Sequence, residues 1–186
     1  MRNFFLLFIS IIGLTSCAED VLPKPKGYLS LTYPANRYKN LTLKRPYSFE
    51  VSEFAIVKDE RRNWLKIQYP KLKASLDITY RPIDNNLKEL LTESEKLVYK
   101  HAVKAEEIVT KNFENFEKRI FGSMQEISGN AASQIQFHLT DSTHNFIKGA
   151  LYFYTKPNYD SILPAVAYIK KDIIHFVETL KWNKKH

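Results

Sequence analysis

The ten residues Phe146-Ile-Lys-Gly-Ala-Leu-Tyr-Phe-Tyr-Thr155 decide the fold, because the strand that they predict is apolar on both sides. Successive side chains of a strand point to opposite sides, so residues 146, 150, 152 and 154 share one side and residues 147, 151 and 153 share the other. A strand that is apolar on both sides is typical of the centre of a sheet whose two faces are covered. We therefore expect the middle of a sheet here, with further elements packed on each face.

Six other stretches predict strands of the same sheet, paired antiparallel. In the clearest of them, such as Trp64-Leu-Lys-Ile-Gln-Tyr69, apolar and polar residues alternate, and this period of two is typical of a half-buried strand. The break at Pro70–Lys73 predicts a hairpin connection, and the residues before Asp59 are expected to be irregular. The six stretches are residues 28–33, 47–51, 64–69, 75–80, 118–127 and 132–140.

Two stretches have the 3.6-residue period of an amphipathic helix. The first runs from Asn86 to Ala105, with apolar residues on one stripe and charged residues facing away. The second begins near Asp160 or Ser161, either of which can cap it, tolerates Pro164 in its first turn and ends at Leu180. The order of strands, helix, strands and helix predicts an α+β sandwich, in which an antiparallel sheet of about six to seven strands packs with two long helices.

Length and composition agree with a single globular domain, which we expect over residues 27–186. The chain has 186 residues, of which 44% are hydrophobic and 26% charged, with 12 Phe, 11 Tyr and only 5 Gly. These values exclude a collagen-like, coiled-coil or wholly disordered chain. The formal net charge of +8 attracts anionic partners without identifying one.

The amino terminus predicts a lipoprotein signal peptide over residues 1–16. Arg2 gives a positive start, and Phe4–Leu14 is an uncharged apolar run, too short to cross a bilayer as a helix of about 20 residues. The sequence Leu14-Thr-Ser-Cys17 resembles the bacterial lipobox, in which the cysteine is diacylglycerated and the chain is cut directly before it. Cys17 is the only cysteine, so it cannot form an internal disulfide, and acylation accounts for its presence.

Residues 17–26 are expected to tether the domain to a membrane. The stretch Leu22-Pro-Lys-Pro-Lys-Gly27 contains two prolines and two lysines, so it favours an extended conformation over a helix. At about 3.3–3.6 Å per residue, the chain from Ala18 to Lys26 reaches roughly 30 Å. The lipid bilayer is therefore the first predicted partner, through acylated Cys17, and anchoring by more than one acyl chain is effectively permanent.

Positive charge is concentrated in the part of the chain that predicts the first strands. Residues 23–81 hold 13 Lys or Arg against 5 Asp or Glu, whereas residues 82–186 hold 14 against 13. These cations form a candidate surface for anionic lipid headgroups, lipopolysaccharide phosphates, the carboxylates of peptidoglycan or an acidic partner protein, while export excludes nucleic acid. Ordinary solubilising charge is the alternative interpretation. The candidate basic surface consists of Arg37, Lys39, Lys44, Arg45, Arg61, Arg62, Lys66, Lys71 and Lys73.

Few residues form a pattern typical of a catalytic or metal site. Asp172, His175 and Glu178 lie one helical turn apart, which would suit a shared metal, although such groups also occur by chance on the exposed edge of a helix. His101 lies on an apolar stripe and is expected to be a hydrogen-bonded core residue, and Thr140–His144 predicts a turn. No nucleophile elbow, phosphate loop or His-Glu-x-x-His motif occurs. We therefore predict no catalytic residues, no metal and no cofactor.

Beyond the lipobox, the chain contains several short stretches that are specific when they are taken together. They are Leu22-Pro-Lys-Pro-Lys-Gly-Tyr28, Pro46-Tyr-Ser-Phe-Glu50, Trp64-Leu-Lys-Ile67, Ile78-Thr-Tyr80, Leu97-Val-Tyr-Lys-His101, Gly129-Asn-Ala-Ala-Ser-Gln-Ile-Gln-Phe137, Thr140-Asp-Ser-Thr143, Gly149-Ala-Leu-Tyr-Phe153, Asp172-Ile-Ile-His175 and Glu178-Thr-Leu-Lys-Trp182. With them, the chain from Cys17 to about Trp182 resembles the gliding-motility lipoprotein GldD family of Bacteroidota. The resemblance implies a cell-envelope lipoprotein needed for gliding motility and associated with type IX secretion, and it implies no established enzymatic activity.

Three hypotheses of function follow from these observations. The first is a non-enzymatic accessory that docks on other gliding or secretion proteins. The sequence Cys17-Ala-Glu-Asp20 departs from the export tags of surface-displayed lipoproteins, which favours the periplasmic side of the outer membrane. The second hypothesis is a module that binds peptidoglycan or anionic lipid through the candidate basic surface. The third is an envelope hydrolase that uses Asp172, His175 and Glu178.

Overall fold

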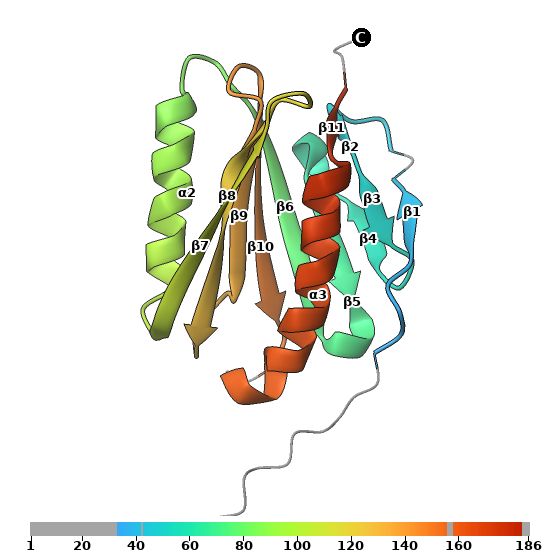
Figure 1. Cartoon of the computed structure of the whole chain (residues 1–186), viewed down its shortest axis with the longest axis vertical. Coiled ribbons are helices and arrows are strands. Elements are labelled where there is room, and N and C mark those ends of the chain that lie inside the picture. Colours follow the sequence, from blue (N-terminus) through green and yellow to red (C-terminus); the bar gives the residue numbers. More distant parts are fainter. Residues whose placement is uncertain (1–32, 42, 156–157, 184–186) are drawn as a thin grey trace, which may run out of the picture. The chain divides into compact units, whose positions relative to one another are not determined.

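The strand Asn145–Phe153, β10, is the fourth of seven strands in an antiparallel sheet. The computed structural model describes residues 33–41, 43–155 and 158–183. Within them, the other six strands are β4 (Ile56–Asp59), β5 (Leu65–Tyr69), β6 (Ala74–Pro82), β7 (Ala105–Asn115), β8 (Ile120–Gly129) and β9 (Ile135–Thr140). Their order in the sheet is β4-β5-β6-β10-β9-β8-β7 (Figure 1). The predicted central position of β10 is confirmed.

The two helices cover opposite faces of this sheet. They are α2 (Leu87–His101) and α3 (Tyr159–Thr179). Lys148 of β10 reaches Glu93 of α2, whereas the next residue, Gly149, faces the ring of Phe137, which packs 5.6 Å from the ring of Phe176 on α3. Because consecutive strand residues point to opposite faces, α2 and α3 lie on different sides of β10. This arrangement confirms the predicted α+β sandwich.

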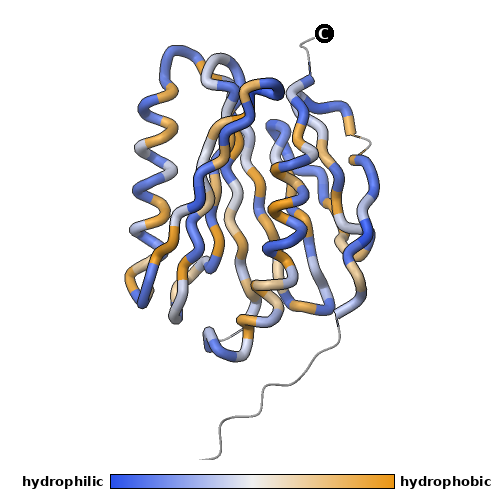
Figure 2. The backbone as a smooth tube through the Cα atoms, in the orientation of Figure 1, coloured by the Kyte–Doolittle hydropathy of each residue, from blue (hydrophilic) through white to orange (hydrophobic). Residues whose placement is uncertain are grey.

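The two helices bury very different amounts of surface. Nine residues of α3 are buried, whereas α2 buries only Leu90, Ser94 and Val98. Figure 2 shows hydrophobic residues recurring along α3 and the central strands. On the α2 side of the sheet, Asp77 and Thr79 of β6 are half-buried. Part of this face of the sheet is therefore left uncovered by α2, and the candidate site described below lies there.

Two small sheets pack beside α3. β1 (Tyr38–Asn40) pairs with β3 (Glu50–Ser52), and β2 (Tyr47–Ser48) pairs with β11 (Lys181–Trp182), both antiparallel. Between β2 and β3, Phe49 packs edge-on against Phe176 at 4.2 Å between ring centres. These pairs hold the first and the last described residues beside α3. The predicted strand at 47–51 is thus two short strands, whereas β1 and β11 were not predicted.

The hairpin predicted at Pro70–Lys73 is confirmed, because β5 and β6 pair antiparallel across the short 3-10 turn η2 (Pro70–Leu72). Lys73 closes this turn in the left-handed conformation, with φ of 49°. The strands predicted at 118–127 and 132–140 correspond to β8 and β9, and the turn between β9 and β10 lies where Thr140–His144 predicted it.

Three boundary predictions were wrong, each for a physical reason. The stretch before Asp59 contains the edge strand β4, whose four residues are too few to show a period. The first helix ends at His101, and Ala105 begins β7, a strand that is almost wholly exposed and therefore has no apolar alternation. The second helix is preceded by Asn158 at its N-cap, so Pro164 lies in its second turn and leaves the carbonyl of Asp160 without its helical donor.

The predictions for the amino terminus lie outside the described residues. They are the signal peptide 1–16, the lipidated Cys17 with the tether 17–26, and residues 28–32 of the strand predicted at 28–33. Tyr33, the last residue of that predicted strand, is described and is not in a strand. All described residues belong to one compact unit. Among them, neither helix is both long and apolar enough to cross a bilayer.

Candidate functional site

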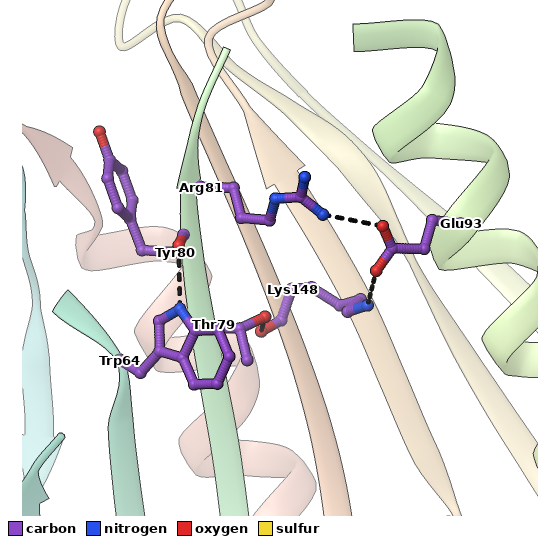
Figure 3. Close-up of polar contacts among 6 residues, drawn as sticks. All are labelled: Trp64, Thr79, Tyr80, Arg81, Glu93 and Lys148. Carbon is purple, nitrogen blue, oxygen red and sulfur yellow. Dashed lines mark hydrogen bonds and ion pairs between the residues drawn. The ribbon is translucent and has the colours of Figure 1, made fainter. Parts of the chain in front are cut away.

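A groove of about 830 Å³ opens between α2 and the part of the sheet that α2 leaves uncovered. β6 and β10 line its floor, α2 forms one wall, and the 3-10 turn η1 (Arg61–Asn63) contributes to its rim. Volumes of this order are typical of ligand-binding clefts. Six side chains give the groove its chemistry, and Figure 3 shows all of them except Arg62. The six are Arg62, Trp64, Thr79, Arg81, Glu93 and Lys148.

A three-residue ion-pair network crosses the groove. Arg81 Nη1 donates to Glu93 Oε2 at 2.8 Å, and Lys148 Nζ donates to Glu93 Oε1 at 3.2 Å (Figure 3). The hydrogen bond from Lys148, opposed by partial burial, lowers the pKa of Glu93, and the charges of Lys148 and Arg81 act in the same direction. The network therefore keeps Glu93 ionised and ties α2 to two neighbouring strands.

Sheet register explains why these residues meet. Phe146 pairs with Arg81 and Lys148 pairs with Thr79, so Arg81 and Lys148 are diagonal neighbours on the same face of β6 and β10. The sequence analysis did not select Arg81, Glu93 or Lys148. One signal was present in the sequence, because Lys148 is the only charged residue in the apolar stretch 146–155.

Trp64 forms the aromatic side of the groove. Its indole Nε1 donates to the carbonyl oxygen of Tyr80 at 3.1 Å (Figure 3), while 38% of the residue remains exposed. Buried indole N–H groups usually find an acceptor, and here that acceptor fixes a ring that is still partly open to solvent. The groove therefore presents a fixed aromatic face beside a charged network.

The turn that carries Arg62 to the rim of the groove has an uncommon backbone. Arg62 and Asn63 both have positive φ, 59° and 63°, and the left-handed region is unfavourable for a residue with a long side chain. The Tyr47 hydroxyl donates to the Asn63 carbonyl at 2.6 Å and stabilises the turn. Within the described part of the chain, Arg62 makes no ion pair, so its charge is open to a ligand.

The nine residues of the candidate basic surface are distributed over several parts of the fold. Arg61 and Arg62 lie before β5, whereas Lys71 and Lys73 lie after it, about 17 Å away for a strand of five residues. Only Arg62 lines the groove. Arg37, Lys39 and Lys44 are exposed near β1, and Lys66 forms an ion pair with Asp77 at 3.4 Å.

Arg45, the ninth of these residues, is buried. Its guanidinium forms an ion pair with Asp59, and its backbone carbonyl accepts a hydrogen bond from Asn183 Nδ2 at 2.9 Å. Arg45 is therefore a structural cation that joins β4 to Asn183, just after β11, and its charge is not open to a ligand.

Asp172, His175 and Glu178 have three different environments. Asp172 is buried and accepts a hydrogen bond from Asn36 Nδ2 at 2.6 Å, whereas Glu178 is exposed. His175 Nε2 donates to Glu50 Oε2 at 2.7 Å. Nowhere in residues 33–41, 43–155 and 158–183 do three or more His, Cys, Asp or Glu side chains come together as metal ligands.

Two of these residues hold the first described segment, Tyr33–Asn40, against α3. The ring of His175 stacks on Tyr38 at 3.6 Å between ring centres, and Asn36 binds Asp172 as described. Burial first, and then the nearby Asp172 carboxylate, raise the pKa of Tyr38. Tyr33 also stacks on Tyr168 of α3 at 4.9 Å. We refer to these contacts as the α3 clasp.

A second cavity of about 400 Å³ lies between α2 and the strands β7 to β9. Ser123 and His138 line it, but Ser123 Oγ is 3.4 Å from His138 Nδ1 and already accepts a hydrogen bond from Gln125 at 2.7 Å. Burial lowers the pKa of His138. This pair lacks the short serine–histidine hydrogen bond of an activated nucleophile, so we take the first groove as the candidate site.

His101 and Asp141 have structural roles. The Gln136 side-chain amide donates to His101 Nδ1 at 3.2 Å, and burial lowers the pKa of this half-buried histidine, followed by the charges of Lys100 and Lys148. Asp141 Oδ1 accepts from the backbone N–H groups of Thr143, His144 and Asn145 at 2.7–2.9 Å. The first pair links α2 to β9, and the second builds the turn into β10.

The sequence matches the profile of a protein family described as gliding motility lipoprotein GldD over residues 18–182. The chain belongs to the GldD family. The match begins directly after Cys17 and includes the groove and both helices, and the predicted resemblance is confirmed. Membership makes the chain a membrane-anchored cell-envelope lipoprotein, and the family description names motility and no reaction. No curated protein matched the sequence.

Proposed function

We propose that the chain is a non-enzymatic accessory of the gliding motility machinery, associated with type IX secretion, that docks on another envelope protein. The observation that carries the proposal is membership of the GldD family, with a match that covers residues 18–182. In this proposal, acylated Cys17 anchors the protein in the outer membrane on its periplasmic side, and residues 18–26 separate the folded domain from the bilayer.

The α3 clasp fixes the first described segment of the chain on one face of the folded domain. Tyr33, Asn36 and Tyr38 are held on α3 by two ring stacks and a hydrogen bond. The chain therefore enters the folded domain on the face that α3 covers, and the groove opens on the opposite face of the sheet, beside α2. A partner can reach the groove without displacing the segment that leads to the tether.

The test is genetic and uses the host cell. Deletion of the gene is expected to abolish spreading on agar and to reduce the release of type IX cargo into the medium. Complementation with the full-length gene should restore both. Complementation with Cys17→Ala should restore neither, because the unanchored protein is no longer held at the membrane. An Asp84→Asn variant, altered at an exposed loop position, serves as the control and should complement fully.

Crosslinking in intact cells tests the docking part of the proposal. Mass spectrometry of crosslinked, tagged protein should recover gliding or secretion subunits from wild-type cells and none from the Cys17→Ala strain. A deletion strain with normal gliding and normal cargo release would contradict the proposal, and so would full activity of Cys17→Ala protein at wild-type abundance.

A further inference from the structure

The fixed indole of Trp64 offers a ligand a face for stacking and no free donor. Its N–H is already bound to the Tyr80 carbonyl at 3.1 Å, yet more than a third of the residue is exposed. A large aromatic group held in one orientation at a surface gains contact area at little cost in side-chain entropy. The C–H groups on one side of a pyranose ring make a flat apolar surface that matches such a face.

The charges of the groove favour an anionic ligand. Three cations, Arg62, Arg81 and Lys148, line the groove together with a single carboxylate, Glu93. Arg81 and Lys148 both form ion pairs with Glu93. Arg62, at the rim of the groove, forms no ion pair with any described residue. A guanidinium binds a carboxylate through two parallel hydrogen bonds. Arg62 precedes Trp64 by only two residues and both line the groove, so one sugar residue can contact both.

The remaining polar groups suit hydroxyl groups of a ligand. The Glu93 carboxylate has about four lone-pair positions and accepts two hydrogen bonds, from Arg81 and Lys148. Among the described residues, the Thr79 hydroxyl makes one hydrogen bond, a long one of 3.4 Å to the Lys148 carbonyl oxygen. Glu93 therefore offers acceptor positions and Thr79 a hydroxyl group in the same groove, as recognition of a polyhydroxylated ligand requires.

We propose that this groove binds an acidic oligosaccharide, with one sugar ring stacked on Trp64 and its carboxylate bound by Arg62. A phosphatidylglycerol headgroup fits less well, because it has no ring to stack on Trp64. Six of the nine other lining residues are polar or charged, namely Arg62, Asn63, Thr79, Arg81, Glu93 and Lys148. The site differs from the candidate basic surface, of which it contains only Arg62. The proposal does not rest on the motility role, because binding is measured with the purified protein.

The experiment is a calorimetric titration of the purified full-length protein in neutral detergent micelles. The probes are a soluble disaccharide muropeptide, tetragalacturonate, neutral chitotetraose and phosphatidylglycerol vesicles. At least one acidic saccharide should bind, with chitotetraose at least about tenfold weaker, equivalent to about 1.4 kcal/mol. Preference for the muropeptide would identify the cell wall as the source, and preference for tetragalacturonate a uronic-acid polysaccharide. A Trp182→Phe background, in which Trp64 is the only tryptophan, should show a change in fluorescence on binding.

Matched variants locate the binding site. Trp64→Ala and Arg62→Gln should each weaken binding at least about tenfold, whereas Trp64→Phe, which retains a ring, should lose less. Lys71→Gln removes the same charge from an exposed lysine at the other end of β5 and should leave affinity within about twofold. Circular dichroism checks that each variant is folded.

Four outcomes would overturn the proposal. They are no binding of either acidic saccharide, equal binding of chitotetraose, binding of vesicles alone, and equal losses in Arg62→Gln and Lys71→Gln. The third outcome would assign the groove to lipid, and the fourth would reduce the effect to general charge.

Discussion

Arg45 places a permanent positive charge in a buried position with one carboxylate partner. Asp59 is that partner, and its side chain is 62% exposed, while Nε and Nη1 of Arg45 have no partner among the described residues. Removal of one member of such a pair costs more than replacement of both, because it leaves the other charge uncompensated.

Asp59→Asn should therefore lower the free energy of unfolding by about 1–3 kcal/mol, measured by urea denaturation. The control is Glu126→Gln, which breaks an ion pair between two half-exposed side chains, Glu126 and Lys170, and should cost less than about 1 kcal/mol. If the two variants lost the same free energy of unfolding, burial of Arg45 would not make its ion pair with Asp59 more important than an exposed ion pair.

The turn before β10 makes stability depend on pH through Asp141. Burial alone would raise the pKa of Asp141, but hydrogen bonds from the backbone N–H groups of His144, Asn145 and Thr143 and from the Asn145 side chain lower it. A carboxyl whose pKa is lower in the folded state stabilises the fold above its unfolded pKa, about 3.9, and this contribution is lost as pH falls through the folded value.

Asp141→Asn should destabilise the protein at pH 7 by about 1–3 kcal/mol, and the difference from wild type should shrink below about pH 4. Urea denaturation at pH 7 and pH 3 measures both values. Asp84→Asn, at an exposed loop position, should change stability at neither pH. A difference between Asp141→Asn and wild type that is independent of pH would contradict this account.

At the scale of elements, the packing of β10 on the α3 side depends on the absence of a side chain at residue 149. A Cβ atom there would lie 2.2 Å from Cζ of Phe137, whose ring also contacts Phe176 of α3. Neighbouring atoms in a close-packed core can relieve such an overlap only by moving. The conformational freedom of glycine is not needed here, because the requirement is space.

Gly149→Ala should lower the free energy of unfolding by about 1–3 kcal/mol, and Phe137→Leu should relieve part of that cost in the double variant, measured as a double-mutant cycle. Gly122→Ala is the control. Its Cβ would lie 1.9 Å from the His138 carbonyl oxygen, a backbone atom that Phe137→Leu cannot move aside. Strict additivity of Gly149→Ala and Phe137→Leu would show that the ring is not the obstacle.

At the scale of the whole molecule, the α3 clasp determines where the chain enters the folded domain. His175→Ala removes both the stack on Tyr38 and the hydrogen bond to Glu50. Trypsin cleavage after Arg37 or Lys39 should then be several-fold faster, because local opening of the segment costs less free energy. Glu178→Ala, at an exposed position on the same helix, should not change the rate, and unchanged cleavage in His175→Ala would show that the clasp does not hold the segment.

Several elements could be predicted because their own residues carry the pattern of burial. β10 is apolar on both sides and lies at the centre of the sheet, and the β5–β6 hairpin follows from two alternating runs around Pro70. β7 could not be predicted, because an exposed edge strand has no apolar alternation to detect. Arg45 looked like a surface cation, since its burial depends on a partner, Asp59, from a strand 14 residues further along the chain.

By itself, the sequence determined the α+β class, the two helices, the central strand and the family, because local periodicity and short specific stretches are properties of neighbouring residues. Only the tertiary structure decided that Trp64, Arg81, Glu93 and Lys148 share one groove, that Arg45 is buried, and that Asp172 and His175 bind the first described segment. These side chains come from different strands and helices, and their positions depend on strand register and helix packing, which local patterns do not encode.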